Sequence, residues 1–163
     1  MKLIIFITAV AIALLLSFQL HGAKAMHDTD GGFVTIADFP ALVKAIKQTG
    51  HNGSFWVVLI PGTAENDGYA ANLQYSIENG VLGLDWVLIA KRNIREKEKF
   101  VRIIEEAGYH ADLKEGNGIK YLRVVGPTDI TALGQAVLKR LFGTTSSQKL
   151  QLIITDFKWQ KKV

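Results

Sequence analysis

The sequence predicts an α+β fold with a mainly antiparallel sheet, on three observations. Asn79-Gly80 separates two strand-like segments, and a tight two-residue hairpin turn favours this dipeptide because both residues need positive φ. Two amphipathic segments, about 93–107 and 128–141, have apolar side chains at helical spacing. From about residue 84 the order is strand, helix, strand, strand, helix, strand, which is the ferredoxin-like split βαβ core.

An N-terminal helix and a buried strand precede this core. Asp38 is placed as the helix N-cap with Pro40 in the first turn, and Gly50 is placed to end the helix. The stripe expected on its inner face is Phe39, Leu42, Val43 and Ile46. The next segment, 55–60, is aromatic and β-branched throughout, so it predicts a strand buried on both faces.

The Asn-Gly hairpin joins two strands of different character. Polar and apolar residues alternate over 72–78, whereas 81–89 is apolar nearly throughout. Alternation is typical of a half-buried strand, and a continuous apolar run is typical of a central one. We therefore expect 55–60 and 72–78 to extend the sheet, with 72–78 held beside the first core strand.

The remaining elements are delimited by capping and turn residues. Asn93 and Glu96 predict a capping box for a helix that runs to about Ala107 and ends at Gly108. Two short strands follow at about 110–115 and 119–125. Thr128 or Asp129 is expected to cap the last helix, which Gly143 ends, and a final strand is expected at 150–157.

Residues 1–25 predict export from the cytoplasm. Lys2 precedes an uncharged run of 18 residues, 3–20, and Ala23-Lys24-Ala25 matches the small-x-small site of a signal peptidase. We expect cleavage after Ala25, a flexible stretch over 26–32, and a single α+β domain over 33–163 in the periplasm or secreted. The alternative is an uncleaved anchor at residues 3–20, because about 18–20 apolar residues span a bilayer as a helix.

Composition excludes several classes of function. The chain has no cysteine, so disulfides, thiol nucleophiles and zinc-thiolate sites are excluded, and stability must come from burial. Cleavage would leave 138 residues with 17 basic and 15 acidic side chains, and this near balance indicates no strong preference for a class of partner. The histidines are scattered, so we expect no metal site and no cofactor.

Asp85 is the most unusual carboxylate, because it interrupts the apolar run of the predicted central strand. A buried acid needs a cationic partner or acquires a raised pKa, and active sites use both effects. Arg92 and Arg123 are the candidate partners. The sequence therefore offers one weak catalytic hypothesis, a small hydrolase that uses Asp85 with Arg92 or Arg123.

The 61–71 loop is the candidate for recognition, since loops on a rigid sheet often bind partners. Its candidate binding residues are Glu65, Asn66, Asp67 and Tyr69. No Lys-Ser or Lys-Thr pair follows its glycines, so a phosphate-binding loop is not indicated. RNA-recognition modules share the core topology, but their aromatic-rich strand motif is missing, and we expect no nucleic-acid partner.

The sequence thus favours a binding module over an enzyme. The leading hypothesis is an exported module that binds a protein or peptide partner in the cell envelope, in an immunity-type or inhibitor-type role. The alternatives are the Asp85 hydrolase and a small-ligand sensor that forms a homodimer. Membrane contact is expected only through the N-terminal segment if it stays uncleaved.

Overall fold

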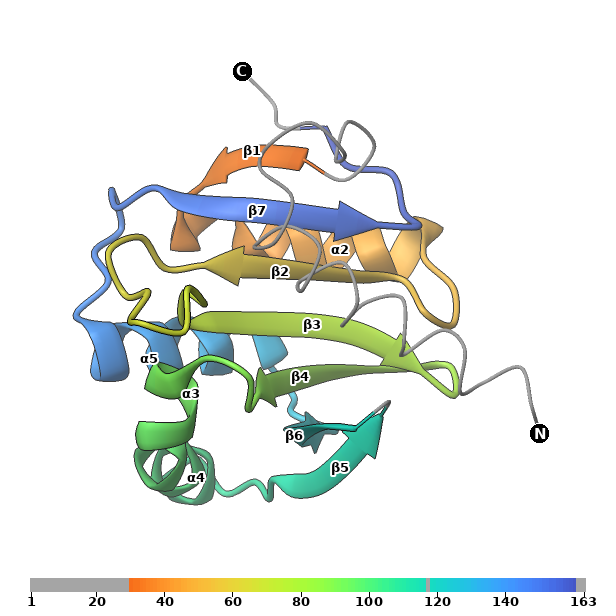
Figure 1. Ribbon diagram of the computed structural model, residues 1–163. Coiled ribbons are helices and arrows are strands. Elements are labelled where there is room, and N and C mark those ends of the chain that lie inside the picture. The colour runs from red at the N-terminus through yellow and green to blue at the C-terminus, as the bar shows by residue number, and fades with distance from the viewer. Residues whose placement is uncertain (1–29, 117, 161–163) are drawn as a thin grey trace.

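The computed structural model describes residues 30–116 and 118–160, and it has one antiparallel sheet of seven strands in the order β1-β7-β2-β3-β4-β6-β5 (Figure 1). The α+β class is confirmed. The strands are β1 (Asp30–Val34), β2 (Phe55–Leu59), β3 (Asn72–Glu78), β4 (Val81–Val87), β5 (Asp112–Gly116), β6 (Ile119–Val125) and β7 (Leu150–Thr155). The helices are the 3-10 turn η1 (Ile36–Asp38), α2 (Phe39–Thr49), α3 (Lys91–Arg95), α4 (Lys97–Glu106) and α5 (Ile130–Phe142).

The hairpin between β3 and β4 forms as predicted. Glu78 and Val81 are partners across the turn, and Asn79 and Gly80 have φ of 53° and 78°. Most side chains cannot adopt two consecutive positive φ values without strain, which is why this dipeptide sets the register.

The strand order differs from the predicted core at one place. In a split βαβ core the last strand lies beside the first, yet here β2 and β3 separate β7 from β4. The hairpin explains the difference. It gives one edge of β4 to β3, and β6 takes the other edge, so β7 pairs with the outer edge of β2.

The expected flexible stretch over 26–32 is partly wrong. Residues 30–32 belong to β1, which pairs antiparallel with β7 and brings Val34 into the core opposite Leu150. The two glycines of Asp30-Gly31-Gly32 suggested a tether, but backbone pairing with β7 overrides that local preference. Residues 26–29, like the predicted signal segment 1–25, lie outside the described residues.

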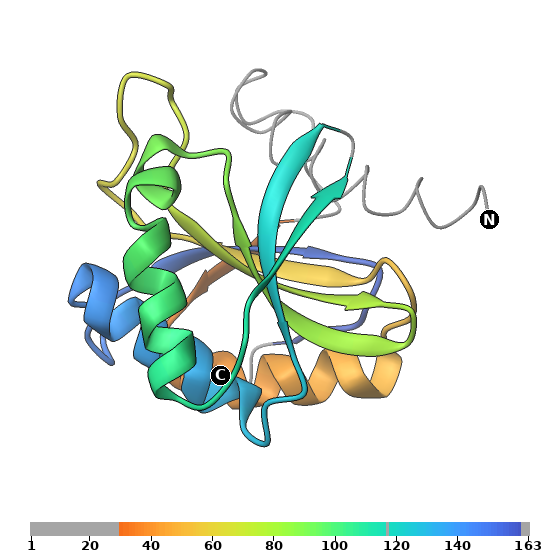
Figure 2. The ribbon, with the colours of Figure 1, turned by 90° about the horizontal axis from the view of Figure 1, so that it is seen from below.

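Helices α2, α4 and α5 lie on one face of the sheet (Figure 2). The largest hydrophobic cluster fills the space between them and the sheet. Trp56 stacks on Tyr75 with ring centroids 4.1 Å apart, and Phe39 of α2 meets Trp56 edge-on at 5.0 Å. These aromatic contacts fix α2 against the sheet, because each buried ring removes a large apolar area from water.

The predicted capping box at Asn93 and Glu96 is wrong. Asn93 lies inside the short helix α3, and Glu96 joins α3 to α4. The Asn93 side chain is fully buried and donates to the carbonyl oxygens of Asn72 and Val87, at 3.0 and 2.9 Å. It also accepts from the amide of Asn72 at 3.1 Å. Asn93 therefore bonds α3 to the ends of β3 and β4 instead of capping a helix.

Helix α5 begins and ends as its sequence predicts. Asp129 accepts a hydrogen bond from the Ala132 amide, and Gly143 has a left-handed φ of 64°. Gly134 lies where the helix crosses the sheet. A Cβ at this position would be only 1.8 Å from the hydroxyl oxygen of Tyr75, whose hydroxyl donates to the Ile130 carbonyl.

This close approach predicts that Gly134→Ala destabilises the fold. Overpacking at a buried contact typically costs about 1–3 kcal/mol, and the free energy of unfolding in urea measures it. Tyr75→Phe removes the clashing oxygen, so the cost of the alanine should be smaller in that background. A double-mutant cycle with zero coupling would contradict this packing.

Candidate functional site

Asp85 lies in the middle of β4, fully buried, and faces Arg123 on β6. One carboxylate oxygen accepts from Arg123 Nη1 at 2.7 Å, and the other accepts from the Ser76 hydroxyl at 2.5 Å. The second guanidinium nitrogen of Arg123 donates to the carbonyl oxygens of Ser76 and Val81. The structure thus selects Arg123 as the partner of Asp85.

Glycine at position 83 makes this ion pair possible. Gly83 precedes Asp85 by two residues on the same face of β4, and the Arg123 guanidinium lies directly over it. A Cβ on Gly83 would be 2.5 Å from Arg123 Cζ. The guanidinium therefore occupies space that any other residue would fill.

Burial raises the pKa of Asp85 to about 6, although the Arg123 charge lowers it. Desolvation disfavours the carboxylate more than one cation compensates. Both carboxylate oxygens are engaged by groups of the sheet itself, so the arrangement is that of a buried structural ion pair.

Arg92, the other predicted partner of Asp85, lies elsewhere. It pairs with Glu96 at 3.3 Å, and its guanidinium lies 5.7 Å from the ring centroid of Phe142. This geometry is that of a cation–π contact. Arg92 therefore belongs to a different site, at the end of the sheet where α3 and α5 meet the 61–71 loop.

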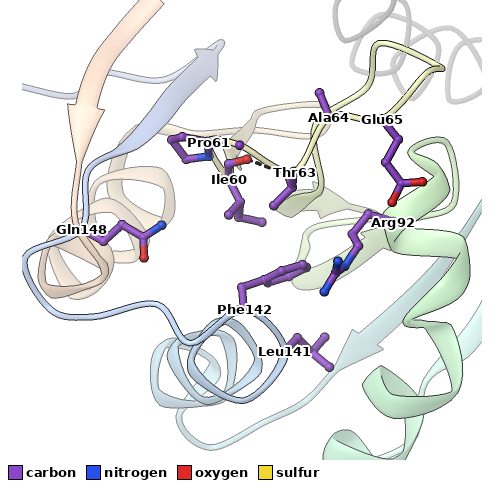
Figure 3. A pocket seen from close by; sticks show the side chains of 10 residues that line it. Ile60, Pro61, Thr63, Ala64, Glu65, Arg92, Leu141, Phe142 and Gln148 are labelled. Atoms are coloured by element: carbon purple, nitrogen blue, oxygen red, sulfur yellow. Dashed lines mark hydrogen bonds between the residues drawn. The ribbon is translucent and has the colours of Figure 1, made fainter.

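That site is a cavity of about 410 Å³ (Figure 3). Arg92 and Phe142 form one wall, the start of the 61–71 loop forms another, and Gln148 lies across from them. Apolar and polar groups are mixed in its lining, as in pockets where a few polar groups orient a ligand. The lining residues are Ile60, Pro61, Gly62, Thr63, Ala64, Glu65, Arg92, Leu141, Phe142 and Gln148.

The loop beside this pocket is held in one conformation by its own side chains. Thr63 Oγ1 donates to the Ile60 carbonyl and accepts from the Ala71 amide, at 2.6 and 2.8 Å, which closes the base of the loop. Asp67 accepts from the backbone amide of Lys91, the first residue of α3, at 2.7 Å. This hydrogen bond is the main cause of the lowered pKa of Asp67.

Glu65 provides the second link to α3 through an ion pair with Arg95, and the hydrogen bond from Arg95 lowers the pKa of Glu65. Of the four predicted binding residues, Glu65 and Asp67 thus brace the loop. Asn66 between them is exposed, and Tyr69 is half-buried. Asn66 is thus the one of the four predicted binding residues that the loop exposes to solvent, where Pro61 and Ala64 are exposed as well.

Sequence reasoning missed two residues of the pocket, Phe142 and Gln148. Phe142 ends the inner stripe of α5, and Gln148 lies in a polar linker. Neither position has a local signal. Only the folded chain brings them opposite residues 60–65.

Over residues 30–160, leaving out 117, no cluster of three histidine, aspartate or glutamate side chains is arranged to hold a metal ion. Within the same residues, no helix combines the length and the apolar character needed to cross a membrane. The predicted signal or anchor segment lies outside the range of both findings.

Asp85 predicts a pH dependence of stability with a definite sign. Its pKa is raised from 3.8 to about 6 on folding, so the native state binds the proton more tightly. The free energy of unfolding should therefore increase as pH falls through 6, by about 1 kcal/mol between pH 7.5 and pH 5.

Asp85→Asn removes this titration, while all other groups stay in both proteins. The difference in stability between wild type and Asp85→Asn should thus change with pH in the stated direction, as measured by urea unfolding at several pH values. Parallel pH profiles for the two proteins would contradict the raised pKa.

Comparison with known proteins does not assign the chain to a family. No family model, no curated protein and no solved structure matches it.

Proposed function

We propose that the protein is an exported α+β module that binds a protein or peptide partner in the cell envelope, in an immunity-type or inhibitor-type role. The observation that supports this most directly is the 61–71 loop. It lacks regular secondary structure, yet hydrogen bonds at Thr63 and Asp67 and the ion pair of Glu65 fix it to the rest of the fold.

Such bracing matters for binding because an ordered loop loses less conformational entropy when a partner docks. Long irregular loops in small domains are more often functional than structural. Asn66 of this loop is exposed to solvent. Residues 61–65, at the start of the loop, line the pocket.

In this proposal the pocket is the anchoring point for the partner. Arg92 is about one-third exposed, and within the described chain its Nε atom has no hydrogen-bond partner. Beside it lies the Phe142 ring, and Pro61 lines the same pocket from the opposite wall (Figure 3). A partner side chain that combines an acceptor with an apolar body suits this lining, since arginine and aromatic residues dominate binding energy at interfaces.

Export and the ferredoxin-like topology of the core are parts of the same proposal. Export rests on the sequence of residues 1–25. The ferredoxin-like description rests on the element order from β4 and on the adjacency of β4, β6 and β5. In this description β2 and β3 precede the core in the chain. In the sheet they lie between the first strand of the core, β4, and its last strand, β7.

A second candidate is the binding of a small ligand, and the volume of the pocket favours it. A cavity of about 410 Å³ is within the range of small-molecule sites. The two candidates use the same residues and differ in the size of the ligand.

The test is to capture the partner and to measure how its affinity for the chain depends on the residues of the pocket. A tagged chain is recovered from the envelope fraction of its producing cells, and the affinity of the captured protein is then titrated. Arg92→Gln should weaken binding about tenfold or more, because a charge-assisted hydrogen bond contributes about 1.5–3 kcal/mol.

The matched control is Arg102→Gln on α4, which removes the same charge from an exposed position. Equal affinities for the wild type, Arg92→Gln and Arg102→Gln would contradict binding at the pocket. A pocket that binds small molecules, with no protein captured at all, would favour the second candidate.

A further inference from the structure

The sequence contains the dipeptide Asn-Gly at 52–53, 79–80 and 117–118, and this dipeptide is prone to spontaneous deamidation. Asparagine is among the thermolabile residues, and a following glycine has no side chain to hinder the reaction. The glycine nitrogen loses its proton and attacks Cγ of the asparagine, and the side-chain nitrogen takes up a proton and leaves as ammonia. Water then opens the succinimide ring, which gives aspartate or isoaspartate.

The first two of these dipeptides lie close together in the fold. Asn52-Gly53 is in the turn between α2 and β2, and Asn79-Gly80 is the turn of the β3–β4 hairpin. Both turns are at the same end of the sheet (Figure 1). Asn52 and Asn79 are exposed to solvent, so burial protects neither of them from water.

The nitrogen that would attack Asn79 is engaged by the side chain of Asn52. Strand pairing across the hairpin joins Glu78 to Val81 and does not use the Gly80 amide. Instead, the Gly80 amide donates to Asn52 Oδ1 at 2.6 Å. An amide that donates a hydrogen bond retains its proton and is held in place, so attack on Asn79 requires this bond to break first.

The same holds for the Asn52-Gly53 dipeptide. The Gly53 amide donates to the Ile77 carbonyl oxygen at 2.9 Å, and the Ile77 amide donates to the Ser54 carbonyl oxygen at 3.0 Å. These two bonds continue the pairing of β2 with β3 up to the turn. The carboxamide of Asn52 is meanwhile oriented by its bond to Gly80. Both glycine nitrogens are thus hydrogen-bonded although both asparagines are exposed.

We propose that Asn79 is a site of spontaneous deamidation and that Asn52 is the positioning residue that protects it. The side-chain oxygen of Asn52 keeps the Gly80 nitrogen protonated and away from Asn79 Cγ. When this contact opens, Asn79 is converted to aspartate and isoaspartate. The inference depends on neither export nor partner binding.

Isoaspartate at position 79 would disturb the buried ion pair described above. Isoaspartate carries the main chain through its side-chain carbon, so it lengthens the turn by one methylene. The residues that flank the turn, Glu78 and Val81, are both partners of Arg123. Glu78 pairs with Arg123 at 3.4 Å, and the Val81 carbonyl oxygen accepts from it at 3.0 Å. A longer turn displaces these groups and weakens the setting of Asp85, so the modified protein should unfold at lower urea concentration.

The test compares deamidation rates in the folded and the unfolded chain. Wild-type protein is incubated at mildly alkaline pH with and without urea, and peptide mapping by mass spectrometry quantifies aspartate and isoaspartate at each Asn-Gly. In urea the three dipeptides should react at similar rates, because the same residue follows each asparagine. In native buffer Asn52 and Asn79 should both react more slowly than in urea.

Two substitutions at position 52 isolate the protecting hydrogen bond. Asn52→Ala removes the acceptor and should raise the native rate at Asn79 about fivefold, as expected for the loss of one hydrogen bond of ordinary net strength. Asn52→Asp retains an oxygen acceptor and should keep the wild-type rate. The matched control is Asn66→Ala, at an exposed asparagine of the 61–71 loop, which should leave the rate at Asn79 unchanged.

Urea unfolding of each variant shows that the native state is populated, and Asn52→Gly replaces Asn52→Ala if the alanine variant does not fold. Equal rates at Asn79 in native and unfolded wild type would overturn the protection. Equal native rates at Asn79 in the wild type and Asn52→Ala would overturn the role of Asn52. Acceleration in Asn52→Ala alone, with Asn52→Asp and Asn66→Ala at the wild-type rate, is the result that the structure predicts.

Discussion

The constraint on which the whole structure depends is that a sheet has two faces, and helices α2, α4 and α5 lie on only one of them. The chain has no cysteine, so burial of apolar surface is its main source of stability. Strand β2 shows the constraint most clearly, because all five of its residues are buried. Trp56 and Val58 belong to the helix-covered core, whereas Phe55, Val57 and Leu59 belong to the other face.

The ion pair of Asp85 and Arg123 makes sense within this constraint. A charge in a central strand is tolerated when its partner lies on the adjacent strand and the remaining hydrogen bonds are filled. Gly83 and Ser76 provide the space and the extra hydroxyl. Arg123 also pairs with Glu78 at 3.4 Å, so two carboxylates flank this one guanidinium, and the apolar cluster of the same face lies on β2 and β7.

Local signals in the sequence predicted most elements, because turns and caps depend on a few neighbouring residues. Asn79-Gly80 determined the hairpin, and Asp129 and Gly143 determined the ends of α5. Long-range pairing was not predictable in this way. Strand β1 forms only because β7 accepts it. Asn93 has the local pattern of a cap, but the carbonyl groups that it bonds belong to distant strands.

The same distinction applies to the site. The apolar neighbours of Asp85 in the sequence identified it as an unusual carboxylate. Its pairing with Arg123 and not with Arg92 depends on the position of β6 beside β4 in the sheet. The measurement that tests the central claim most directly is the free energy of unfolding in urea of Val57→Ala and of Val58→Ala, on the two faces of β2. Both residues are fully buried, so each alanine should cost about 1–3 kcal/mol, and the two costs should be similar. A Val57→Ala variant as stable as the wild type, beside a destabilised Val58→Ala variant, would contradict the account.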